Sequence, residues 1–562
     1  MTGAEIRRRP IAPSDLAGDV HPVVRRVYAA RGLRSPGDLD LSLGRLLPIG
    51  SLAGVEAAAE LLAAHRQCGR ILIIGDFDAD GATSTALMVR GLRSLDFAHV
   101  DFLVPDRFRF GYGLTPEIVA LAAALRPTLL VTVDNGVSSI EGVEAAQALG
   151  IPVLITDHHL PGRSLPRAAV IVNPNLPGSE FGSGALAGVG VAFYVIAALA
   201  RLLGAGRFKP ADLLDLVALG TVADVVPLDR NNRVLVDQGL RRIRAGCCVP
   251  GIRALLAAGG RRLESVCAAD LGFAAAPRLN AAGRITDMRV GIACLLADDA
   301  ARAAELAAQL SKLNEERRGI EQRMQLEAID IAAEERTDGA APAPGLCLFE
   351  EGWHQGVVGL VAGRIKDRLH RPVVAFARAE DGSLKGSARS IAGVHVRDAL
   401  DRIAVTHPGL ITRFGGHAMA AGLSLPFENL GAFRDAFARE IATRADAEAL
   451  RGVIHSDGEL SGAELSLGTA RALRGAGPWG QGFPEPVFDG CFEVLAARIV
   501  GGKHLKLSLR TETGAALEAI AFGQGGAEAP AGARLRVAYR LEVNEYGGSE
   551  RLQLNCQHLR PD

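Results

Sequence analysis

Short apolar runs alternate with longer amphipathic segments in the first third of the chain. The runs ILIIG, LLVTVD and IPVLITD lie between Ile71 and Asp157 and are separated by helical patterns such as TSTALMVRGL. Continuous apolar runs of this length, bounded by turn residues, are typical of strands that are buried on both faces of a parallel sheet. The pattern therefore predicts an α/β domain built on a parallel sheet, preceded by a helical segment.

A long helix is predicted over residues 298–336. This stretch contains no proline, and charged residues surround an apolar stripe at helical spacing. Asp298 is the expected N-cap. The segment TDGAAPAP, residues 337–344, has the composition of a linker and is expected to end the helix. The stripe consists of Leu306, Leu310, Leu313, Ile320 and Met324.

The last part of the chain shows two different patterns of apolar and polar residues. Strand-like runs and helical patterns alternate again in a smaller α/β unit, in which we expect KGSARS and FGGH to be loops. Beyond it, segments such as RLRVAYRLEV alternate with a period of two, which predicts a small β-barrel. The predicted domains are a helical N-terminal segment (1–70), an α/β domain (71–297), the connecting helix (298–336), the smaller α/β domain (345–450) and the β-domain (453–562).

The composition is that of a globular protein with several domains. The 562 residues exceed what one hydrophobic core usually supports. The 62 basic and 63 acidic residues nearly balance, so a nucleic-acid site would have to be a local positive groove. Eight scattered cysteines without CxxC spacing suggest reduced thiols rather than a zinc site. Neither the N-terminus nor the uncharged run at residues 184–200 resembles a signal peptide or a membrane span, so we expect a cytoplasmic protein with no membrane contact.

Three aspartates directly follow the first buried strand. Asp76, Asp78 and Asp80 lie at its carboxyl end, where open α/β sheets form their ligand crevices. Carboxylates this close raise each other's pKa values unless a cation binds them. An EF-hand begins with the same D-x-D-x-D-G pattern but needs an acidic residue at loop position twelve, where this chain has Leu87. A solvated acidic turn remains an alternative for this motif taken alone.

Further acids and imidazoles follow later apolar segments. LLVTVD ends in Asp134, IPVLITD is followed by His158 and His159, and ALGTVADVVPL contains Asp224. Histidine together with carboxylate is a ligand set for Mn²⁺ and similar metals. A lone histidine is more often structural, and Asp224 alone could equally cap a helix or a turn. Their combination predicts a divalent-metal site at one edge of the sheet.

The motifs resemble, in order and spacing, the DHH phosphoesterase superfamily and within it the RecJ family. The superfamily motif often begins with a histidine where this chain has Ile74, and this departure favours RecJ over the pyrophosphatases. The resemblance implies a single-strand-specific 5′→3′ DNA exonuclease of repair and recombination, with a DHH domain, a DHH-associated domain and an oligonucleotide-binding (OB) barrel. The motifs are GDFDADG, VDNG, TDHH with NPN at 173–175, GTVADVVPL, PRLNAAGR, KGSARS and GGHAMAAG.

The resemblance also implies roles for individual residues. Asp134 would bridge two Mn²⁺ or Mg²⁺ ions, and Asp76 and His159 would complete the site as a ligand or as a contact to the scissile phosphate. The full set of implied ligands is Asp78, Asp80, Asp134, His158 and Asp224. The residues implied to hold the 5′-phosphate are Arg107, Ser387 and Arg389.

Other residues are candidates for binding the substrate. Guanidinium groups suit phosphates, and glycines let the backbone approach a strand closely. The alternatives are a structural ion-pair loop for the first three candidates, a tight turn with a capping histidine for the next three, and ordinary half-exposed strands for the basic residues of the β-domain. The candidates are Arg278, Asn280 and Arg284; Gly415, Gly416 and His417; and Lys503, His504, Lys506, Arg510, Arg534, Arg536 and Arg540.

Three other functions compete with the nuclease. A DHH-type oligoribonuclease or dinucleotide phosphodiesterase usually lacks the β-barrel, and a haloacid-dehalogenase-type phosphatase would not explain the Asp-His-His motif. A non-catalytic Cdc45-like scaffold does not require the intact acids and histidines. The resemblance further implies a monomer that acts on single-stranded DNA, with single-stranded-DNA-binding protein and a helicase as partners.

Overall fold

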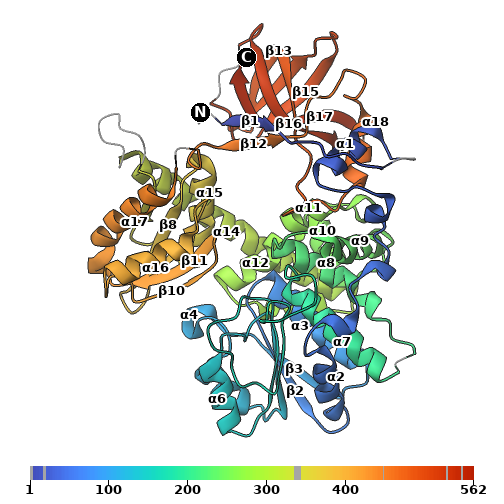
Figure 1. The fold of residues 1–562 in the computed structure, drawn as a ribbon, viewed down its shortest axis with the longest axis vertical. Coiled ribbons are helices and arrows are strands. Elements are labelled where there is room, and N and C mark those ends of the chain that lie inside the picture. Colours follow the sequence, from blue (N-terminus) through green and yellow to red (C-terminus); the bar gives the residue numbers. More distant parts are fainter. Residues whose placement is uncertain are drawn as a thin grey trace.

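The computed structural model describes residues 4–16, 20–204, 206–334, 343–446, 448–526, 530–545 and 549–562. Figure 1 shows a parallel sheet with its helices at the bottom, a smaller α/β lobe at the left and a β-barrel at the top. Helices from the middle of the chain connect the three. The predicted parallel sheet, long helix, smaller α/β unit and β-barrel are therefore all present.

The parallel sheet has the strand order β3-β2-β4-β5-β6. Ile71 and Ile73 of β2 pack in one hydrophobic core, and Leu72 and Ile74 pack in another on the opposite face. Burial on both faces explains the unbroken apolar runs in the sequence. The strands are β2 (Arg70–Gly75), β3 (His99–Leu103), β4 (Leu129–Val133), β5 (Val153–Thr156) and β6 (Val170–Val172).

Helices cover both faces of this sheet. Helices α2, α3, α7 and α8 share the core of Ile71, whereas α5 and α6 share the core of Leu72. The helices are α2 (Val55–Ala64), α3 (Ala79–Ser94), α4 (Arg107–Phe110), α5 (Pro116–Ala123), α6 (Ile140–Ala148), α7 (Gly188–Leu202) and α8 (Leu214–Ala223).

A group of helices leads from the sheet into the long helix α14 (Ala300–Glu334). Asp299 caps α14, because its Oδ2 accepts from the N–H of Arg302 at 2.7 Å. Asp298 instead pairs with Arg90 at 2.9 Å, so its predicted role as N-cap is wrong by one residue. The preceding elements are α9 (Arg230–Arg244), α10 (Pro250–Ala258), α11 (Ala268–Asp270), the π-helical turn η6 (Leu271–Ala275), α12 (Ala276–Ile285) and α13 (Arg289–Leu296).

The smaller α/β unit has the strand order β10-β11-β9-β8-β7. KGSARS and FGGH, which were predicted as loops, contribute to strands β9 and β10. A Cβ at Gly386 would lie 2.7 Å from Cδ1 of Phe376, so glycine here lets β9 pass close to an aromatic ring rather than marking a loop. The elements are β7 (Leu346–Phe349), α15 (Val358–Leu369), β8 (Val373–Arg378), β9 (Leu384–Arg389), α16 (Val396–Thr406), β10 (Arg413–Gly416), β11 (Ala420–Leu425) and α17 (Leu430–Arg444).

A closed barrel with the order β13-β14-β15-β17-β16 ends the chain. Leu505, Leu507 and Leu509 of β14 all point into its core, as the period-two pattern predicts. Helix α18 packs beside the barrel. The elements are α18 (Leu467–Gly475), β13 (Phe488–Val500), β14 (His504–Arg510), β15 (Ala516–Ala521), β16 (Arg534–Asn544) and β17 (Arg551–Pro561).

The N-terminal segment is only partly helical. It contains α1 (Pro22–Ala30), but β1 (Glu5–Arg8) pairs in parallel with β12 (Val453–Ser456) near the start of the barrel domain. The sequence missed β1 because its partner strand lies at the other end of the chain. In the described part of the chain, no single helix is long and apolar enough to span a membrane. The bent pair of segments Leu43–Ser51 and Val55–Ala64 is together long and apolar enough, by length and composition alone.

Candidate metal centre

Three neighbouring strands of the parallel sheet each end directly before an aspartate of the predicted motifs. Asp76 follows β2, Asp134 follows β4 and Asp157 follows β5, and β4 lies between the other two strands. Because these strands are parallel, their carboxyl ends meet at one edge. Asp224 reaches the same edge from the C-terminal end of α8.

The side chains at this edge form overlapping groups whose potential ligand atoms lie within 4.8 Å of one another. His158 Nε2 lies 3.1 Å from Asp134 Oδ1 and 3.5 Å from Asp224 Oδ2. The first pair is close but lacks hydrogen-bond geometry, and neither atom has a hydrogen-bond partner among the described residues. The groups are Asp76, Asp78 and Asp134; Asp80, His158 and Asp224; and Asp134, His158 and His159.

Backbone N–H groups hold two of the carboxylates. The side chain of Asp80 accepts from Gly188 at 2.7 Å and Val189 at 3.0 Å, in the first turn of α7. Asp78 accepts from two N–H groups in the first turn of α3, both at 3.0 Å. The positive end of each helix dipole favours these negative charges. Gly188 is needed at its position, because a Cβ there would lie 2.5 Å from Asp134 Oδ1.

Asp157 orients the two histidines. Its Oδ1 accepts from the backbone N–H groups of His158 and His159, at 2.8 and 3.1 Å, and from Nδ1 of His159 at 2.7 Å. Asn175 and Asn173 of the NPN motif donate to the carbonyl oxygens of His158 and His159, at 2.6 and 2.9 Å. Sequence reasoning noted Asp157 within its motif but gave it no role. The signal was its place between a buried strand and two histidines.

The two histidines differ in protonation state at neutral pH. Burial, with the charge of His159, lowers the pKa of His158 to about 4, so this ring is neutral and offers a lone pair. Burial opposes the charge on His159, but the hydrogen bond that its ring donates to Asp157, together with the negative charges of Asp157, Asp76 and Asp78, outweighs burial and raises the pKa of His159 to about 9. His158 is therefore in the form that binds a metal, whereas His159 has the charge that suits an anion.

Burial and mutual repulsion make the cluster unfavourable for bare carboxylates. Burial and the charge of Asp78 raise the pKa of Asp80 to about 7. Burial and the charge of Asp80 raise the pKa values of Asp134 and Asp224 well above the ordinary carboxyl range. Divalent cations would relieve this repulsion and coordinate the buried Asp134 Oδ1 and His158 Nε2, which lack a hydrogen-bond partner among the described residues. The donor set of carboxylates and one neutral imidazole fits Mn²⁺ or Mg²⁺.

Mn²⁺ affinity is expected to fall as the pH is lowered through about 7. The pKa of Asp80 is about 7 in the folded chain and 3.8 for an ordinary aspartate, so a bound metal must displace a proton at lower pH. Each linked proton weakens binding by about tenfold per pH unit below the pKa. Isothermal titration calorimetry at pH 6 and pH 8 measures this difference. Equal affinity at both values would contradict a metal site at Asp80.

The sign of the stability effect follows from the same pKa. Between 3.8 and about 7 the folded chain without metal binds more protons at Asp80 than the unfolded chain does, so its stability falls as the pH rises. Mn²⁺ removes this loss. The increase in Tm that Mn²⁺ causes is therefore expected to be larger at pH 8 than at pH 6.

Helix α12 packs against the turn that joins β2 to α3. Asn280 Oδ1 accepts from the N–H of Ala79 at 2.8 Å. Gly283 permits the closest approach, because a Cβ there would overlap the carbonyl oxygen of Phe77. PRLNAAGR is helical rather than a loop, since it is rich in small residues and has proline in its first turn. The side chain of Asn280 thus contacts the turn at residues 76–79, which carries the candidate ligands Asp76 and Asp78 and is called the metal-binding turn below.

The two arginines of α12 make different contacts. Arg278 donates to the hydroxyl of Ser311 at 2.9 Å and to two backbone carbonyls at 2.6 and 2.8 Å, so its guanidinium joins neighbouring helices. This engagement favours a structural role for Arg278. Arg284 donates to the carbonyl oxygen of Gly356 at 3.2 Å. Helix α12 therefore connects the metal-binding turn with the smaller α/β domain.

Ser387 and Arg389 lie on β9 beside the N-terminus of α15. Arg389 donates to Ser387 Oγ at 2.8 Å. Both side chains reach the first turn of α15, since a Cβ at Gly359 would lie 2.8 Å from Arg389 Nη2 and from Ser387 Oγ. A guanidinium, a hydroxyl and a helix N-terminus together suit a phosphate group. Arg107, predicted as their partner, begins α4, but its side chain lies outside the described residues.

The smaller α/β domain also reaches the metal-binding edge directly. Gly415 and Gly416 end β10, and the ring of His417 stacks on that of His159 with centroids 6.2 Å apart and an interplanar angle of 19°. Burial and the charge of His159 lower the pKa of His417. The neutral His417 ring is therefore compatible with the charged ring beside it.

Tyr112 is a site residue that sequence reasoning missed. Its hydroxyl donates to the carbonyl oxygen of Asp134 at 3.1 Å, and its ring packs edge-on against His159 with centroids 5.6 Å apart. The ring also packs edge-on against Phe77. A tyrosine in the glycine-rich segment GYG follows no strand and has no charge, so no pattern marked it.

The barrel surface is less positive than its sequence suggests. Five of the seven basic residues predicted there are paired with carboxylates. The pairs are Lys506–Glu518 at 2.5 Å, Arg510–Glu493 and Arg534–Glu512 at 3.5 Å, Arg536–Asp489 at 4.0 Å and Arg540–Glu485 at 2.6 Å.

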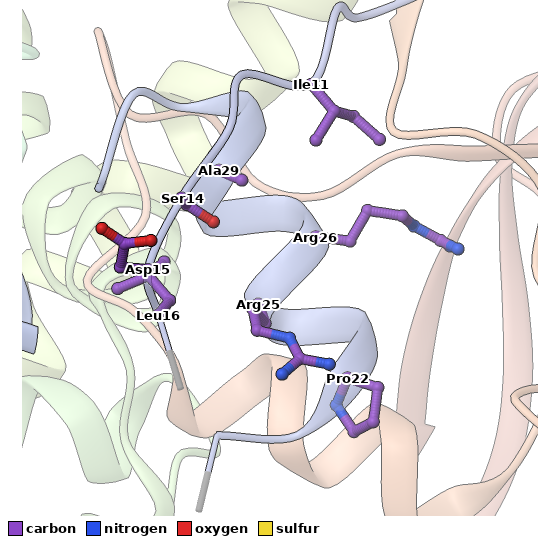
Figure 2. Close-up of a pocket in the computed structure, with 8 residues that line it drawn as sticks. All are labelled: Ile11, Ser14, Asp15, Leu16, Pro22, Arg25, Arg26 and Ala29. Carbon is purple, nitrogen blue, oxygen red and sulfur yellow. The ribbon is translucent and has the colours of Figure 1, made fainter. Parts of the chain in front are cut away.

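A separate pocket lies between residues 11–16 and helix α1 (Figure 2). Figure 2 shows that its lining comes from these two segments, which carry no residue of the metal-binding edge. We assign it no part in the chemistry. Its lining residues are Ile11, Ser14, Asp15, Leu16, Pro22, Arg25, Arg26 and Ala29.

The sheet edge and the domain order define a metal-dependent phosphoesterase of the DHH type. Family models match the chain in three places: the DHH family N-terminal domain at residues 70–221, the DHHA1 domain at 343–443 and the RecJ OB domain at 456–558. The predicted fold class is therefore confirmed, including the OB domain as a closed barrel.

Whole-chain relatives identify the family. The single-stranded-DNA-specific exonuclease RecJ of Dickeya dadantii (strain 3937) is 53% identical, and that of Escherichia coli (strain K12) is 51% identical, each over 99% of both chains. The crystal structure of RecJ from Thermus thermophilus in complex with Mn²⁺ has a TM-score of 0.83 and 32% identity, covering 99% of this chain and 80% of that one. The chain belongs to the RecJ family of single-stranded-DNA-specific exonucleases. The prediction of Mn²⁺ or Mg²⁺ is confirmed by solved RecJ structures that hold each metal.

Proposed function

We propose that the chain is a Mn²⁺- or Mg²⁺-dependent exonuclease that degrades single-stranded DNA from its 5′ end, in DNA repair and recombination. The observation that carries the proposal is the convergence of carboxylates and histidines at one sheet edge. Relatives identical at about half of their positions are single-stranded-DNA-specific exonucleases. In this proposal the helical N-terminal segment (1–70) precedes the catalytic domain (71–297). The connecting helix (298–336) joins the catalytic domain to the domain that holds the 5′ end (345–450), and the β-domain (453–562) binds the strand.

The residues of the site divide into ligands and contacts to the phosphate. Asp134 lies in both the histidine and the carboxylate groups, which supports its role as the ligand shared by two ions. When bound, the ions supply a hydroxide nucleophile near neutral pH and stabilise the leaving oxygen. The charged ring of His159 is suited to contact the scissile phosphate, with Asp76 beside it as a contact or a further ligand. The proposed ligands are Asp78, Asp80, Asp134, His158 and Asp224.

The direction of degradation requires a pocket that recognises the 5′ end. Ser387 and Arg389 at the N-terminus of α15 support such a pocket, and Arg107 is proposed as their partner. Arg284 and the stacked ring of His417 support contact between this domain and the metal centre. Gly415 and Gly416 are proposed to line the path of the strand, and Asn280 and Arg278 to act through the packing of α12.

Arg389→Ala is expected to reduce the preference for 5′-phosphorylated over 5′-hydroxyl ends. One charge-assisted hydrogen bond contributes about 2 kcal/mol, which corresponds to about 30-fold in the ratio of kcat/KM values. The measurement is kcat/KM on matched oligonucleotides with each end. Arg378→Ala, on the neighbouring strand β8, is the control because the Arg378 guanidinium pairs with Glu351 and lies over the ring of Phe427. An undiminished preference in the Arg389 variant would place the pocket elsewhere.

Hydrolysis of a 5′-phosphorylated oligonucleotide tests the proposed function. Release of nucleotides from the 5′ end of single-stranded DNA with Mn²⁺, and none with EDTA, is the expected result. Faster cleavage of short RNA or linear dinucleotides would favour the DHH-type oligoribonuclease instead. No hydrolysis of any of these substrates would favour the Cdc45-like scaffold.

The proposal extends to the setting of the reaction. We propose that the chain acts as a monomer in the cytoplasm, with single-stranded-DNA-binding protein and a helicase supplying its substrate. The relatives named as single-stranded-DNA-specific exonucleases support a substrate that must first be opened from duplex. The cysteines, all within the described residues, are free thiols, as expected in a reducing compartment.

A further inference from the structure

Phe273 has the most exposed large hydrophobic side chain among the described residues, at 73%. It belongs to the π-helical turn η6, in which Leu271, Ala274 and Ala275 are buried. π-Helical turns occur frequently at functional sites. Because its ring packs into no core, Phe273 contributes little to the fold, and its exposure calls for another explanation.

The turn η6 lies beside the end of helix α8 that carries Asp224. A Cβ at Gly272, next to Phe273, would lie 3.3 Å from Cγ1 of Val222, two residues before Asp224. Val225 follows the aspartate, is 63% exposed and has a φ of 60°, which is unusual for a β-branched residue. Exposed apolar surface therefore adjoins the carboxylate cluster on this side.

A hydrogen bond to the carbonyl oxygen of Ala274 holds the backbone of the turn that carries Phe273. The guanidinium of Arg278 donates to the carbonyl oxygen of Ala274 within η6 and to Ser311 on α14. Burial, and then the charge of the exposed Arg318, lower the pKa of Arg278, so a further positive charge lies close to this turn. An exposed aromatic ring on a held backbone, with arginines nearby, is a suitable surface for a base and its phosphate.

We propose that Phe273 is a stacking platform for one nucleobase of the single strand whose scissile phosphate lies at the metal centre. This inference rests on the proposed function. In Figure 1, the flanking helices α11 and α12 lie between the β-barrel and the parallel sheet. Stacking tolerates any base, which suits an exonuclease without sequence preference.

The test combines binding with a probe of stacking. A 5′-phosphorylated oligothymidine with one 2-aminopurine, moved along the strand, is titrated with full-length chain in the Asp134→Asn background. Phe273→Ala and Phe273→Leu are expected to weaken binding about tenfold and to abolish fluorescence quenching at one position, whereas Phe273→Trp retains both. Val405→Ala is the matched control, because Val405 is 66% exposed on α16 of the other domain.

The outcomes separate this inference from the proposed function. Hydrolysis of the oligonucleotide by the parent chain, combined with unchanged binding and quenching in Phe273→Ala, overturns the stacking site and leaves the nuclease assignment standing. Loss of binding without any position-specific change in quenching also overturns it. Absence of Mn²⁺-dependent hydrolysis by the parent chain overturns both proposals.

Discussion

Asp134→Asn is expected to lower nucleotide release about 1000-fold while the chain remains folded, since loss of one ligand disables metal-assisted hydrolysis worth several kcal/mol. Asp134 is 2% exposed and lies 3.1 Å from His158 Nε2. Its φ of 62° is left-handed, a conformation that asparagine adopts readily. The substitution by asparagine therefore removes the charge without straining the backbone, whereas alanine would strain it.

Asp96→Asn is a closely matched control for this prediction. Asp96 also has a φ of 62°, but its side chain is 85% exposed and pairs with Arg66 on the surface. We expect its turnover and Mn²⁺ binding to equal those of the parent chain. The measurements are kcat on a 5′-labelled oligonucleotide, Mn²⁺ calorimetry and thermal melting. Turnover within a few-fold of the parent for Asp134→Asn would refute the metal assignment.

Gly283→Ala is expected to impair both stability and catalysis. The added methyl group would overlap the backbone carbonyl of Phe77, in the turn between Asp76 and Asp78, and a backbone atom cannot move aside alone. Overpacking of this kind costs about 3 kcal/mol. A displacement of the turn by about 1 Å would lower kcat by about 100-fold. Thermal melting and kcat measurements on the same preparations give the two effects.

Gly319→Ala separates the clash from the general effect of replacing a helical glycine. Gly319 lies within α14, and a Cβ built there meets no atom within 4 Å outside its chain neighbours and the nearby backbone of its own helix, among the described residues. Alanine is the better helix former by about 1 kcal/mol, so this variant is expected to gain stability and keep full activity. If Gly283→Ala behaved in the same way, the close packing of α12 on the metal-binding turn would be disproved.

The candidate ligands were accessible from the sequence because each lies at the end of a local apolar pattern. Asp134 and His158 come directly after runs that are unbroken because both faces of the sheet are buried, and parallel strands end at one edge. The OB barrel was accessible for a similar reason, since its strands alternate with a period of two. Local periodicity reports which faces of an element are buried.

The supporting residues depend on contacts between distant parts of the chain. Asn280 and Gly283 meet the turn at Phe77 only because α12 packs there, and Tyr112 reaches His159 through a loop without a pattern. The same applies to β1, whose partner strand is near the other end of the chain.

The sequence by itself determined most of the element types, the ends of the buried strands and the chemical identity of the candidate ligands, because these follow from local burial and side-chain chemistry. Only the tertiary structure decided which atoms meet: that Asp157 orients the histidines, that Arg278 joins helices and that Phe273 stays exposed. Packing between distant segments selects these contacts, and a local pattern carries no information about that packing.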